Sequence, residues 1–290
     1  MKAILLGPNG QLGTDIVRAN TALGAPLDLH PLDRQALDLT DFETVRTVLG
    51  SADFDVLINC SSYHKTDDVE QNAQLGVTVN AHLVQLLARL CEQRAARFVH
   101  VSTDYVFGGQ SKRTPLSEDD PTAPVNVYGA SKAMGETLAT LACARTTVLR
   151  VASLFGIAGA SGKGGNFVET MIRFGREKGA LRVVADQHMS PTSTYDIATT
   201  LIDMLKADVE PGIWHVVNSG DATWHAFAEE IIRQTGIAAT VEPITSAEFP
   251  TPAMRPPYSV LSNAKVAAVV GERRHWTVAL RDYLRDKGHI

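Results

Sequence analysis

Short apolar runs alternate with longer amphipathic segments along the first half of the chain. The runs are Ala3 to Leu6, Val56 to Ile58, Phe98 to Val101 and Val148 to Val151, followed later by Arg182 to Val184. Runs this short and this rich in Val, Ile and Leu are typical of parallel strands that are buried on both faces. Between two of them, residues 80–94 carry leucines at helical spacing. The pattern therefore predicts β-α-β units and an α/β fold with a Rossmann-type doubly wound parallel sheet.

The regular alternation ends near residue 151. Glycine-rich residues 159–165 and proline-rich residues 250–257 interrupt it, and such clusters mark loops. A chain of 290 residues is long enough for a nucleotide-binding unit that carries a smaller second lobe. We expect a first domain over residues 1–150 and a smaller C-terminal lobe built mainly from residues 151–290. A later strand near residues 182–200 is expected to return to the first sheet.

Composition and charge argue against several classes of protein. Hydrophobic residues make up 44% of the chain and charged residues 20%, with a formal net charge of −5, as in ordinary globular proteins. This charge gives no reason to expect nucleic acid or a membrane as partner. Three scattered cysteines without a CxxC pair indicate neither disulfides nor a zinc site. The N-terminal apolar run is too short for a signal peptide, and we expect a cytoplasmic protein.

The first chemical motif is a GxxGxxG turn at residues 7–13, directly after the first predicted strand and before a helical pattern that begins at Thr14. Glycine permits a tight turn and lets the backbone approach a pyrophosphate, whose charge is met by free amides at the start of the helix. The letters alone also fit an ordinary glycine turn. Their place after an N-terminal strand favours a dinucleotide-binding domain. The expected contacts come from Gly7, Asn9, Gly10, Gln11 and Leu12.

The adenosine half of a dinucleotide is read by residues after the second strand, which is expected to end near Leu32. Asp33 is suited to a ribose diol and so to NAD, whereas Arg34 is suited to a 2′-phosphate and so to NADP. Both side chains also fit a solvated turn. Asp38 and Leu39, at the end of the next predicted strand, are placed to flank the adenine. We expect NADPH as the cofactor, with NADH as the alternative.

Tyr128 and Lys132 stand at positions i and i+4 of a predicted helix and therefore share one of its faces. A tyrosine near pKa 10 is a poor acid or base at neutral pH, and a neighbouring ammonium is expected to lower its pKa. Such a pair alone also occurs by chance on surface helices. Thr103, however, follows the strand predicted at 98–101, at the end where open α/β sheets bind ligands. The three residues are therefore the expected catalytic set.

Many further motifs follow in the order found in the dTDP-4-dehydrorhamnose reductase family of the extended short-chain dehydrogenase/reductases, which the chain resembles over nearly its whole length. The matching segments are 7–13, Asn59-Cys60-Ser61-Ser62-Tyr63, Ser102 to Phe107, Asn126 to Gly129, Ser131-Lys132, Gly135-Glu136, Asp186-Gln187, Ser190 to Thr192, Pro250 to Ala253 and Arg255-Pro256. The resemblance implies that the C-terminal lobe binds substrate. It also implies reduction of a 4-keto group on a nucleotide-linked deoxysugar, with hydride from the nicotinamide.

The resemblance also implies a role for each matching residue. Tyr128 would donate a proton, Lys132 would hold the nicotinamide ribose, and Thr103 would polarise the ketone. The positions lining the cofactor would be Cys60, Ser61, Ser62, Tyr63, Tyr128 and Lys132. The positions meeting the substrate would be Thr103, Asp104, Tyr105, Ser153 and Arg255. Arg255 resembles the residue that grips the diphosphate, because a guanidinium can bind phosphate oxygens in bidentate fashion.

Two segments depart from the family pattern near the expected sugar. Where the family commonly shows Arg-Thr-Ser-Trp, residues 150–153 read Arg-Val-Ala-Ser, so Ser153 replaces an aromatic ring. His64 and Lys65 follow Tyr63 in place of smaller, less charged residues. If Ser153 and Lys65 both face the sugar, the pocket is roomier and more polar than in the family. In the plainer interpretation Lys65 points to solvent and His64 is a satisfied loop residue.

Two other functions occur on this fold. Some relatives bind a dinucleotide as regulatory subunits of other enzymes, and others are sugar-nucleotide epimerases or dehydratases. The complete set of Thr103, Tyr128 and Lys132 favours an enzyme, and Asp104-Tyr105 follows the reductase pattern. Some family members bind magnesium at a dimer interface through an acid placed like Asp15, but partner acids are not recognisable here and we expect no metal. Monomer and homodimer both stay open.

Overall fold

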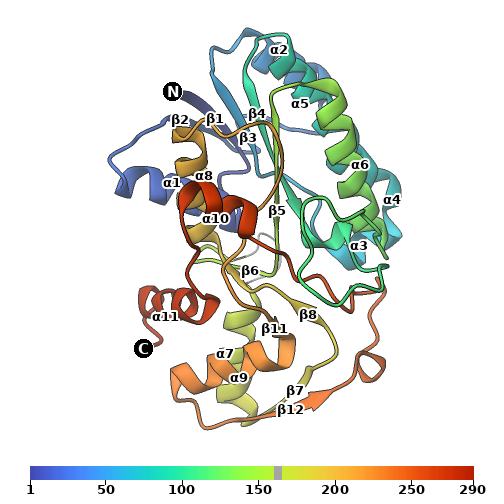
Figure 1. Ribbon diagram of the computed structural model, residues 1–290, viewed down its shortest axis with the longest axis vertical. Helices are drawn as coiled ribbons and strands as arrows, with labels where there is room; N and C mark the ends of the chain where they lie inside the picture. Colours follow the sequence, from blue (N-terminus) through green and yellow to red (C-terminus); the bar gives the residue numbers. More distant parts are fainter. Residues whose placement is uncertain (160–164) are drawn as a thin grey trace.

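A computed structural model describes residues 1–159 and 165–290, with the main parallel sheet in the upper lobe and a second lobe below it (Figure 1). The main sheet has six strands in the order β10-β5-β4-β3-β1-β2, and every pair of neighbours is parallel. The strands are β1 (Lys2–Leu6), β2 (Asp28–Leu32), β3 (Val56–Asn59), β4 (Arg97–Thr103), β5 (Thr146–Val151) and β10 (Gly212–His215). The strand order reverses at β1, as in a doubly wound sheet. This confirms the expected Rossmann-type fold.

Helices cover both faces of the sheet, which explains the continuous apolar runs. Ala3 and Leu5 of β1 pack into the core under α1 (Gln11–Ala22) and α8 (Thr194–Lys206). Ile4 and Leu6 of the same strand pack into the opposite core. That second face carries α2 (Phe42–Ser51), α5 (Leu83–Glu92) and α6 (Val127–Ala142). Alternate residues point to opposite faces of a strand, so a strand covered on both sides is apolar at every position.

The second lobe, in the lower half of Figure 1, has its own hydrophobic core. Three aromatic rings pack together there. The ring centroids of Phe155 and Phe227 are 5.7 Å apart, and those of Phe227 and Trp276 are 5.4 Å apart. The elements are β6 (Leu154–Phe155), α7 (Phe167–Lys178), β7 (Ala180–Val184), β8 (His188–Met189), β9 (Thr192–Ser193), β11 (Ala222–Thr223), α9 (Trp224–Thr235), β12 (Thr240–Ile244), η3 (Ser246–Glu248) and α11 (Trp276–Asp286). Part of the glycine-rich segment at 159–165 lies outside the described residues.

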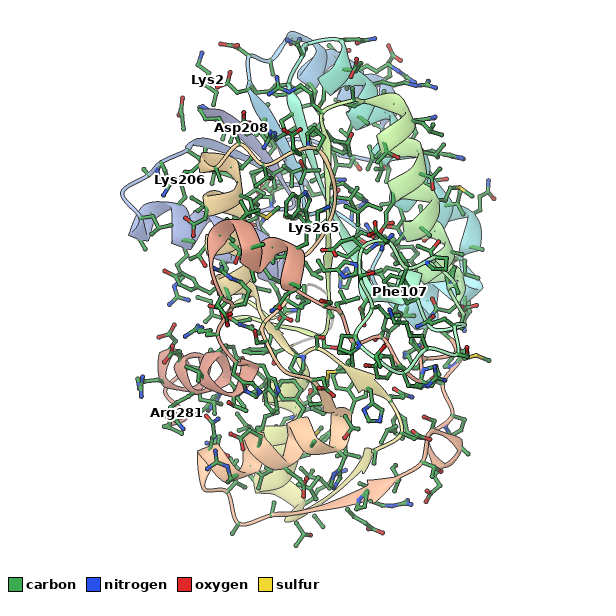
Figure 2. All side chains as sticks on the ribbon, viewed as in Figure 1. Lys2, Phe107, Lys206, Asp208, Lys265 and Arg281 are labelled. Atoms are coloured by element: carbon green, nitrogen blue, oxygen red, sulfur yellow. The ribbon has the colours of Figure 1, made fainter. Side chains whose placement is uncertain are left out.

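The strand expected to return to the first sheet near 182–200 was assigned wrongly. β7 pairs in parallel with β12 in a separate two-stranded sheet of the second lobe. Ala180 and Arg182 are exposed, while the residues between and after them are buried. One face of β7 is therefore exposed to solvent, which does not suit a sheet covered by helices on both sides. The returning elements are α8 and β10 instead. Figure 2 labels Asp208, which follows α8, and Lys265, whose Nζ donates to the carbonyl of Ile213 in β10.

Several short elements complete the chain. They are α3 (Thr66–Gln71), α4 (Ala73–Val77), the π-helical turn η1 (Thr78–His82), the 3₁₀ turn η2 (Asp104–Val106) and α10 (Ala264–Val270). The helix expected over 80–94 therefore begins with a π turn before α5. Such turns occur where a side chain must be directed away from the regular helical position.

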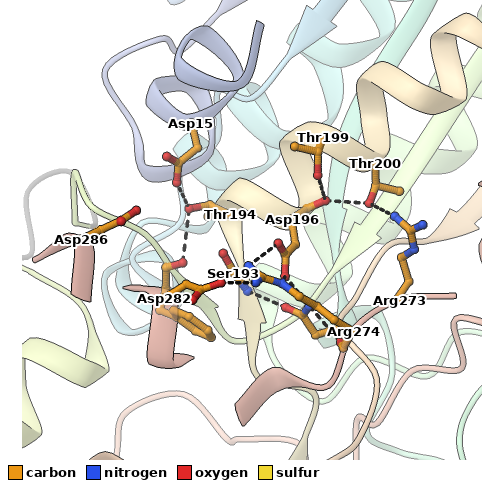
Figure 3. A network of polar contacts seen from close by, with 12 residues as sticks. Asp15, Ser193, Thr194, Asp196, Thr199, Thr200, Arg273, Arg274, Asp282 and Asp286 are labelled. Carbon is orange, nitrogen blue, oxygen red and sulfur yellow. Dashed lines mark hydrogen bonds and ion pairs between the residues drawn. The ribbon is translucent and has the colours of Figure 1, made fainter. Parts of the chain in front are cut away.

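Polar contacts fasten the last helix to the sheet domain, as Figure 3 shows. Thr194 at the start of α8 donates a hydrogen bond to Asp15 of α1. Arg274 binds both carboxylate oxygens of Asp196 at 2.7 and 2.8 Å and also pairs with Asp282 of α11. No helix of the described residues is both long and apolar enough to cross a membrane.

Candidate active site

A cleft of about 550 Å³ runs along the carboxyl ends of β1, β3, β4 and β5. Open α/β sheets bind their ligands at this edge, next to the point where the strand order reverses. The predicted residues on its wall are Gly7, Asn9, Gly10, Gln11, Leu12, Asp33, Arg34, Asp38, Leu39, Cys60, Ser61, Ser62, Thr103, Asp104, Tyr128, Lys132 and Ser153. Tyr63, Tyr105 and Arg255, also predicted, do not line it. The wall residues that we did not assign to the site are Pro8, Gly13, Leu32, Leu37, Thr40, His64, Val79, Val101, Ser102, Val151 and Leu154.

The glycine turn has the close backbone contacts expected of a phosphate-binding loop. Gly7 has a φ of 76°, and a Cβ there would lie 3.1 Å from the backbone nitrogen of Ser61. A Cβ on Gly13 would lie 2.7 Å from the Cα of Pro8, so α1 packs directly on the turn. The helix begins at Gln11, earlier than the expected Thr14, and no side chain caps its first amides. Those amides are therefore available to a ligand phosphate.

Asp33 is engaged by the protein at the other end of the cleft. Its Oδ1 accepts hydrogen bonds from the backbone nitrogens of Gln35 and Ala36, each at 2.9 Å. These backbone bonds, together with one from the Asn9 side chain, hold the pKa of Asp33 below its usual value. Arg34 is exposed and lines the cleft. This arrangement favours a ligand that brings a negative charge to Arg34.

Asp38 and Leu39 line the same end of the cleft but belong to no strand, contrary to the sequence prediction. They lie in the connection between β2 and α2, where the Asp38 carboxylate accepts from the backbone nitrogen and hydroxyl of Thr40. An aspartate that binds the backbone two residues ahead forms a turn rather than a strand. Their predicted contact with adenine stays a prediction.

Replacing Arg34 by alanine should weaken NADPH binding about ten- to a hundredfold while leaving NADH binding almost unchanged. Only NADPH carries a 2′-phosphate, and a charge-assisted hydrogen bond contributes about 1.5–3 kcal/mol. Fluorescence titration of both cofactors measures the two affinities. Arg46→Ala is the matched control, because Arg46 lies on α2 and pairs with Glu43 at the surface. Equal losses for the two cofactors would place 2′-phosphate recognition elsewhere.

Thr103, Tyr128 and Lys132 come together at the inner end of the cleft. Thr103 ends β4, and its hydroxyl lies 3.1 Å from Oδ1 of Asp104 and accepts from the backbone nitrogen of Tyr105. The phenol of Tyr128 lies beside the hydroxyls of Thr103 and Ser62, and both lower its pKa. One oxygen atom placed between Thr103 and Tyr128 would therefore meet two hydroxyl groups. This is the geometry that protonation of a carbonyl requires.

The pKa of Tyr128 is raised rather than lowered, contrary to the sequence prediction. Burial raises it to about 12, and the neighbouring hydroxyls of Thr103 and Ser62 oppose this rise only in part. Lys132 does not offset this burial, because its Nζ donates to the carbonyl of Val101 at 2.7 Å and contacts His100. Tyr128 is consequently a protonated phenol at neutral pH, which is the form that donates a proton.

Asn80, in the π turn, positions the cofactor-side loop and was missed by the sequence analysis. Its Oδ1 accepts from the backbone nitrogen of Tyr63 at 2.9 Å and from the hydroxyl of Ser62 at 3.2 Å. Its Nδ2 donates to the carbonyl of Tyr63 and to the hydroxyl of Ser131 on α6. A Cβ on Gly135 would collide with the Asn80 carbonyl, so α6 packs tightly here. Only its position inside a helix, where asparagine is unfavourable, could have signalled this role.

The N-terminus of α6 is fixed by two side chains from other elements. Asn126 caps it by accepting from Gly129 at 2.7 Å, and its amide also donates to the carbonyl of Met254 at 2.8 Å. Glu70 accepts from the backbone nitrogen of Val127 at 2.7 Å. A Cβ on Gly129 would collide with the carbonyl of Tyr105. These contacts therefore fix the position of α6, and of Tyr128 in its first turn, relative to the end of β4.

Three other predicted substrate residues, Asp104, Tyr105 and Arg255, make hydrogen bonds, ring contacts or ion pairs with other residues of the protein. Asp104 is buried and accepts from Ser259 at 2.5 Å, and burial raises its pKa to about 6. The ring of Tyr105 packs edge-on against that of Tyr128, with centroids 5.9 Å apart. Arg255 pairs with Asp67 of α3 at 2.7 Å, and the same carboxylate accepts from the backbone nitrogen at 253. Their direct contact with substrate stays a prediction.

The two departures from the family pattern have different positions. Ser153 lines the cleft and has a φ of 43°, a left-handed conformation that is uncommon for residues other than glycine. Lys65 is 42% exposed, does not line the cleft, and pairs with Asp68 at 3.6 Å, as the plainer interpretation expects. His64 lines the cleft beside Ser62. Of the residues that depart from the family pattern, Ser153 and His64 therefore line the cleft and Lys65 does not.

Asp15, which stands where some family members have a magnesium-binding acid, lies beside an arginine. Arg18 lies 3.5 Å from it and also pairs with Asp286 of α11. Within residues 1–159 and 165–290, no three His, Cys, Asp or Glu side chains are arranged to hold a metal ion. The expected absence of a metal stays a prediction.

Comparison with known proteins identifies the family. A family model described as the RmlD substrate binding domain matches residues 1–288. The chain belongs to the RmlD family. This RmlD-family chain is 38% identical over 289 residues to a probable dTDP-4,6-dihydroxy-2-methyloxan-3-one 4-ketoreductase from Streptomyces antibioticus, covering 99% of this chain and 95% of that relative.

Two solved structures resemble the RmlD-family chain along its whole length. A dTDP-4-dehydrorhamnose reductase from Clostridium acetobutylicum is 35% identical, with a TM-score of 0.92 and coverage of 99% and 100% of the two chains. A dTDP-4-dehydrorhamnose reductase from Bacillus anthracis, solved in complex with NADP, is 31% identical, with a TM-score of 0.90 and coverage of 98% and 99%. These findings confirm the family and the reductase class expected from the sequence.

Proposed function

We propose that this protein reduces the 4-keto group of a nucleotide-linked deoxysugar, taking a hydride from NADPH and a proton from Tyr128. The observation that carries the proposal is the meeting of Thr103, Tyr128 and Lys132 at one end of a cleft that begins at the glycine turn. A dinucleotide in this cleft would place its pyrophosphate at the start of α1, and its nicotinamide would reach the end of β4.

The protein's groups have distinct tasks in this reaction. Thr103 and Tyr128 would hold the ketone oxygen, and Tyr128 would deliver the proton as the nicotinamide delivers the hydride. Lys132 would bind the hydroxyls of the nicotinamide ribose. The chemistry of hydride transfer is the cofactor's own, while the chain orients the two reactants and supplies the acid. The B. anthracis relative solved with NADP supports NADPH as the reductant.

Arg255 is proposed to bind the diphosphate of the sugar nucleotide. It lies in the turn after residue 253 and is partly exposed beside Asp67 of α3. A diphosphate offers a guanidinium stronger and more numerous acceptors than one carboxylate does. Substrate binding would then exchange one ion pair for another, and the turn would stay fastened through Asn126 and Met254.

The sugar itself is proposed to differ from the 4-keto precursor of dTDP-rhamnose on the strength of Ser153, since Lys65 does not line the cleft. Ser153 leaves space where the family commonly has an aromatic ring, and His64 adds a polar edge to the cleft. The S. antibioticus relative is a probable 4-ketoreductase with a differently named substrate. Variation of the sugar within this family supports a substrate other than the rhamnose precursor.

Ser153→Trp should raise kcat/KM for the dTDP-linked rhamnose precursor and lower it for the preferred sugar, each by about tenfold. An aromatic platform contributes about 0.5–1.5 kcal/mol beyond the area that it buries. Steady-state oxidation of NADPH with a panel of nucleotide-linked 4-ketosugars measures both values. Ser153→Ala is the matched control, because it keeps a side chain at the same backbone angle without adding a ring.

The same panel separates the proposal from its alternatives. Efficient reduction of the rhamnose precursor by the parent protein, unchanged in Ser153→Trp, would return the common family substrate to this chain. Tight NADPH binding with no oxidation on any 4-ketosugar would indicate a regulatory subunit. Interconversion of sugar epimers without net consumption of cofactor would indicate an epimerase. Sedimentation of the same preparation distinguishes a monomer from a homodimer.

A further inference from the structure

Two oppositely charged side chains are buried one turn apart on α6. Lys132 and Glu136 are 1% and 4% exposed, and both belong to the buried face of the helix, which packs against β4. Residues at positions i and i+4 of a helix have Cβ atoms about 5–6 Å apart. The two side chains therefore share an enclosed region in which charges are screened poorly.

The direct contacts of the Lys132 ammonium bring no anion to it. Within residues 1–159 and 165–290, its Nζ donates to the carbonyl of Val101 at 2.7 Å and lies 3.1 Å from Nε2 of His100. Burial and then the charge of Lys132 lower the pKa of His100 well below its usual value, so this ring is uncharged at neutral pH. Burying an ammonium without a neighbouring negative charge is costly. The charge of Lys132 must therefore be offset from further away.

The Glu136 carboxyl group is bound by donors from two strands. Arg150 of β5 contacts it through Nε at 3.0 and 3.2 Å and through Nη2 at 2.7 Å. The hydroxyl of Ser102, on β4, donates to it at 2.5 Å. A carboxylate accepts all of these contacts, whereas a carboxylic acid would present a donor of its own to them. Glu136 is therefore held in its ionised form.

The charge of Glu136 acts on Lys132 against the effect of burial. Burial lowers the pKa of Lys132 to about 8, and Glu136 opposes this fall more than Cys60 does. Burial raises the pKa of the Cys60 thiol and of the Tyr128 phenol to about 12 each, so both are uncharged at neutral pH. We propose that Glu136 is a positioning residue that keeps Lys132 an ammonium at the inner end of the cleft.

The charged form of Lys132 suits its place beside a cofactor. With a pKa of about 8 the ammonium predominates at neutral pH. It has three donors, so it can keep its bond to the carbonyl of Val101 and still donate to ribose hydroxyls. The inference rests on the proposed function only in the partner it gives to this ammonium. Its decisive test needs neither substrate nor turnover.

The test is the titration of Lys132 in the full-length, cofactor-free protein. The Cε resonance of ¹³C-labelled lysine is assigned by its loss in Lys132→Met. In the parent it should titrate near pH 8, and in Glu136→Gln at least about one pH unit lower, because the amide has the same shape and no charge. An unchanged midpoint in Glu136→Gln would overturn the proposal.

A double variant separates the carboxylate from its arginine. Glu136→Gln alone leaves Arg150 as an unpaired buried cation, whereas Glu136→Gln/Arg150→Met removes both charges. The Lys132 midpoint should stay low in the double variant. A return to the parent value would mean that the unpaired arginine caused the fall, and the proposal would be wrong.

Ser102→Ala is the matched control, because it removes one donor to Glu136 and leaves the charge in place. The Lys132 midpoint in this variant should stay close to that of the parent. A fall as large as that in Glu136→Gln would attribute the effect to disturbed packing and contradict the proposal.

The affinity for NADPH at a series of pH values gives a second readout. If the ammonium holds the ribose, affinity is full below the pKa of Lys132 and falls as the pH rises through it. In Glu136→Gln this fall should begin about one pH unit lower, and a fall at the same pH in both proteins would contradict the inference. A parent protein with the expected titrations that reduces no 4-ketosugar would contradict the proposed function alone.

Discussion

Tyr128→Phe should lower kcat about a hundredfold or more while leaving the affinity for NADPH nearly unchanged. The loss of a general acid typically costs a factor of about 10² to 10⁴. Phenylalanine keeps the ring that packs on Tyr105 and removes only the hydroxyl that contacts Thr103 and Ser62. Stopped-flow measurement of NADPH oxidation gives the rate of the chemical step, and fluorescence titration gives the affinity.

Tyr195→Phe is the control for this substitution. Tyr195 lies on α8, under the guanidinium of Arg18 and away from the cleft, so loss of its hydroxyl should leave kcat within a factor of about two. If Tyr128→Phe reduced the ketone as fast as the parent does, the proton would have to come from another group. Thr103 is the nearest hydroxyl, and Thr103→Val would then be the informative variant.

Arg150→Met should lower the free energy of unfolding by about 3–5 kcal/mol, the usual cost of leaving one member of a buried ion pair alone. Arg150 and Glu136 are 2% and 4% exposed, and the guanidinium binds both carboxylate oxygens, with contacts of 2.7, 3.0 and 3.2 Å. The arginine also stacks on Phe107, 4.9 Å from the ring centroid. Urea denaturation measures the loss.

The double variant Arg150→Met/Glu136→Met should recover most of that stability, because no buried charge is then left unpaired. Arg46→Met, at an exposed pair on α2, should change the free energy of unfolding by less than about 0.5 kcal/mol. A loss below about 1 kcal/mol for Arg150→Met would mean that water reaches Glu136. The Glu136→Met substitution in the double variant also removes the acceptor of the Ser102 hydroxyl, which donates to the Glu136 carboxylate at 2.5 Å.

The four inner strands of the main sheet, β1, β3, β4 and β5, were predictable because they are buried and largely apolar on both faces. The same signal misled at Arg182 to Val184, where a short apolar run belongs to a strand with one exposed face. Length and hydrophobicity cannot distinguish these two environments, since both give short runs rich in valine, isoleucine or leucine. β10 was missed for the opposite reason, because only two apolar residues stand between Gly212 and His215 at its ends.

The site was predictable where local spacing carries the chemistry. Residues i and i+4 of a helix share a face, so Tyr128 and Lys132 could be paired from the sequence. Contacts that join distant segments leave no such trace. Arg255 and Asp67 lie 188 positions apart, and nothing near either residue indicates that they pair. The pKa of Tyr128 was also out of reach, because it depends on burial and on where the lysine nitrogen points.

Because the chain leaves the sheet after β5, returns with α8 and β10, leaves again and comes back with α10, neither lobe is a continuous piece of sequence. A growing polypeptide that has reached only residue 150 lacks an edge strand and the helix that covers α1. Its apolar surfaces stay open until residues 194–215 are made, and nascent chains with such surfaces are prone to aggregate. The two lobes therefore acquire their final structure together and should melt in a single cooperative transition rather than as two separable domains.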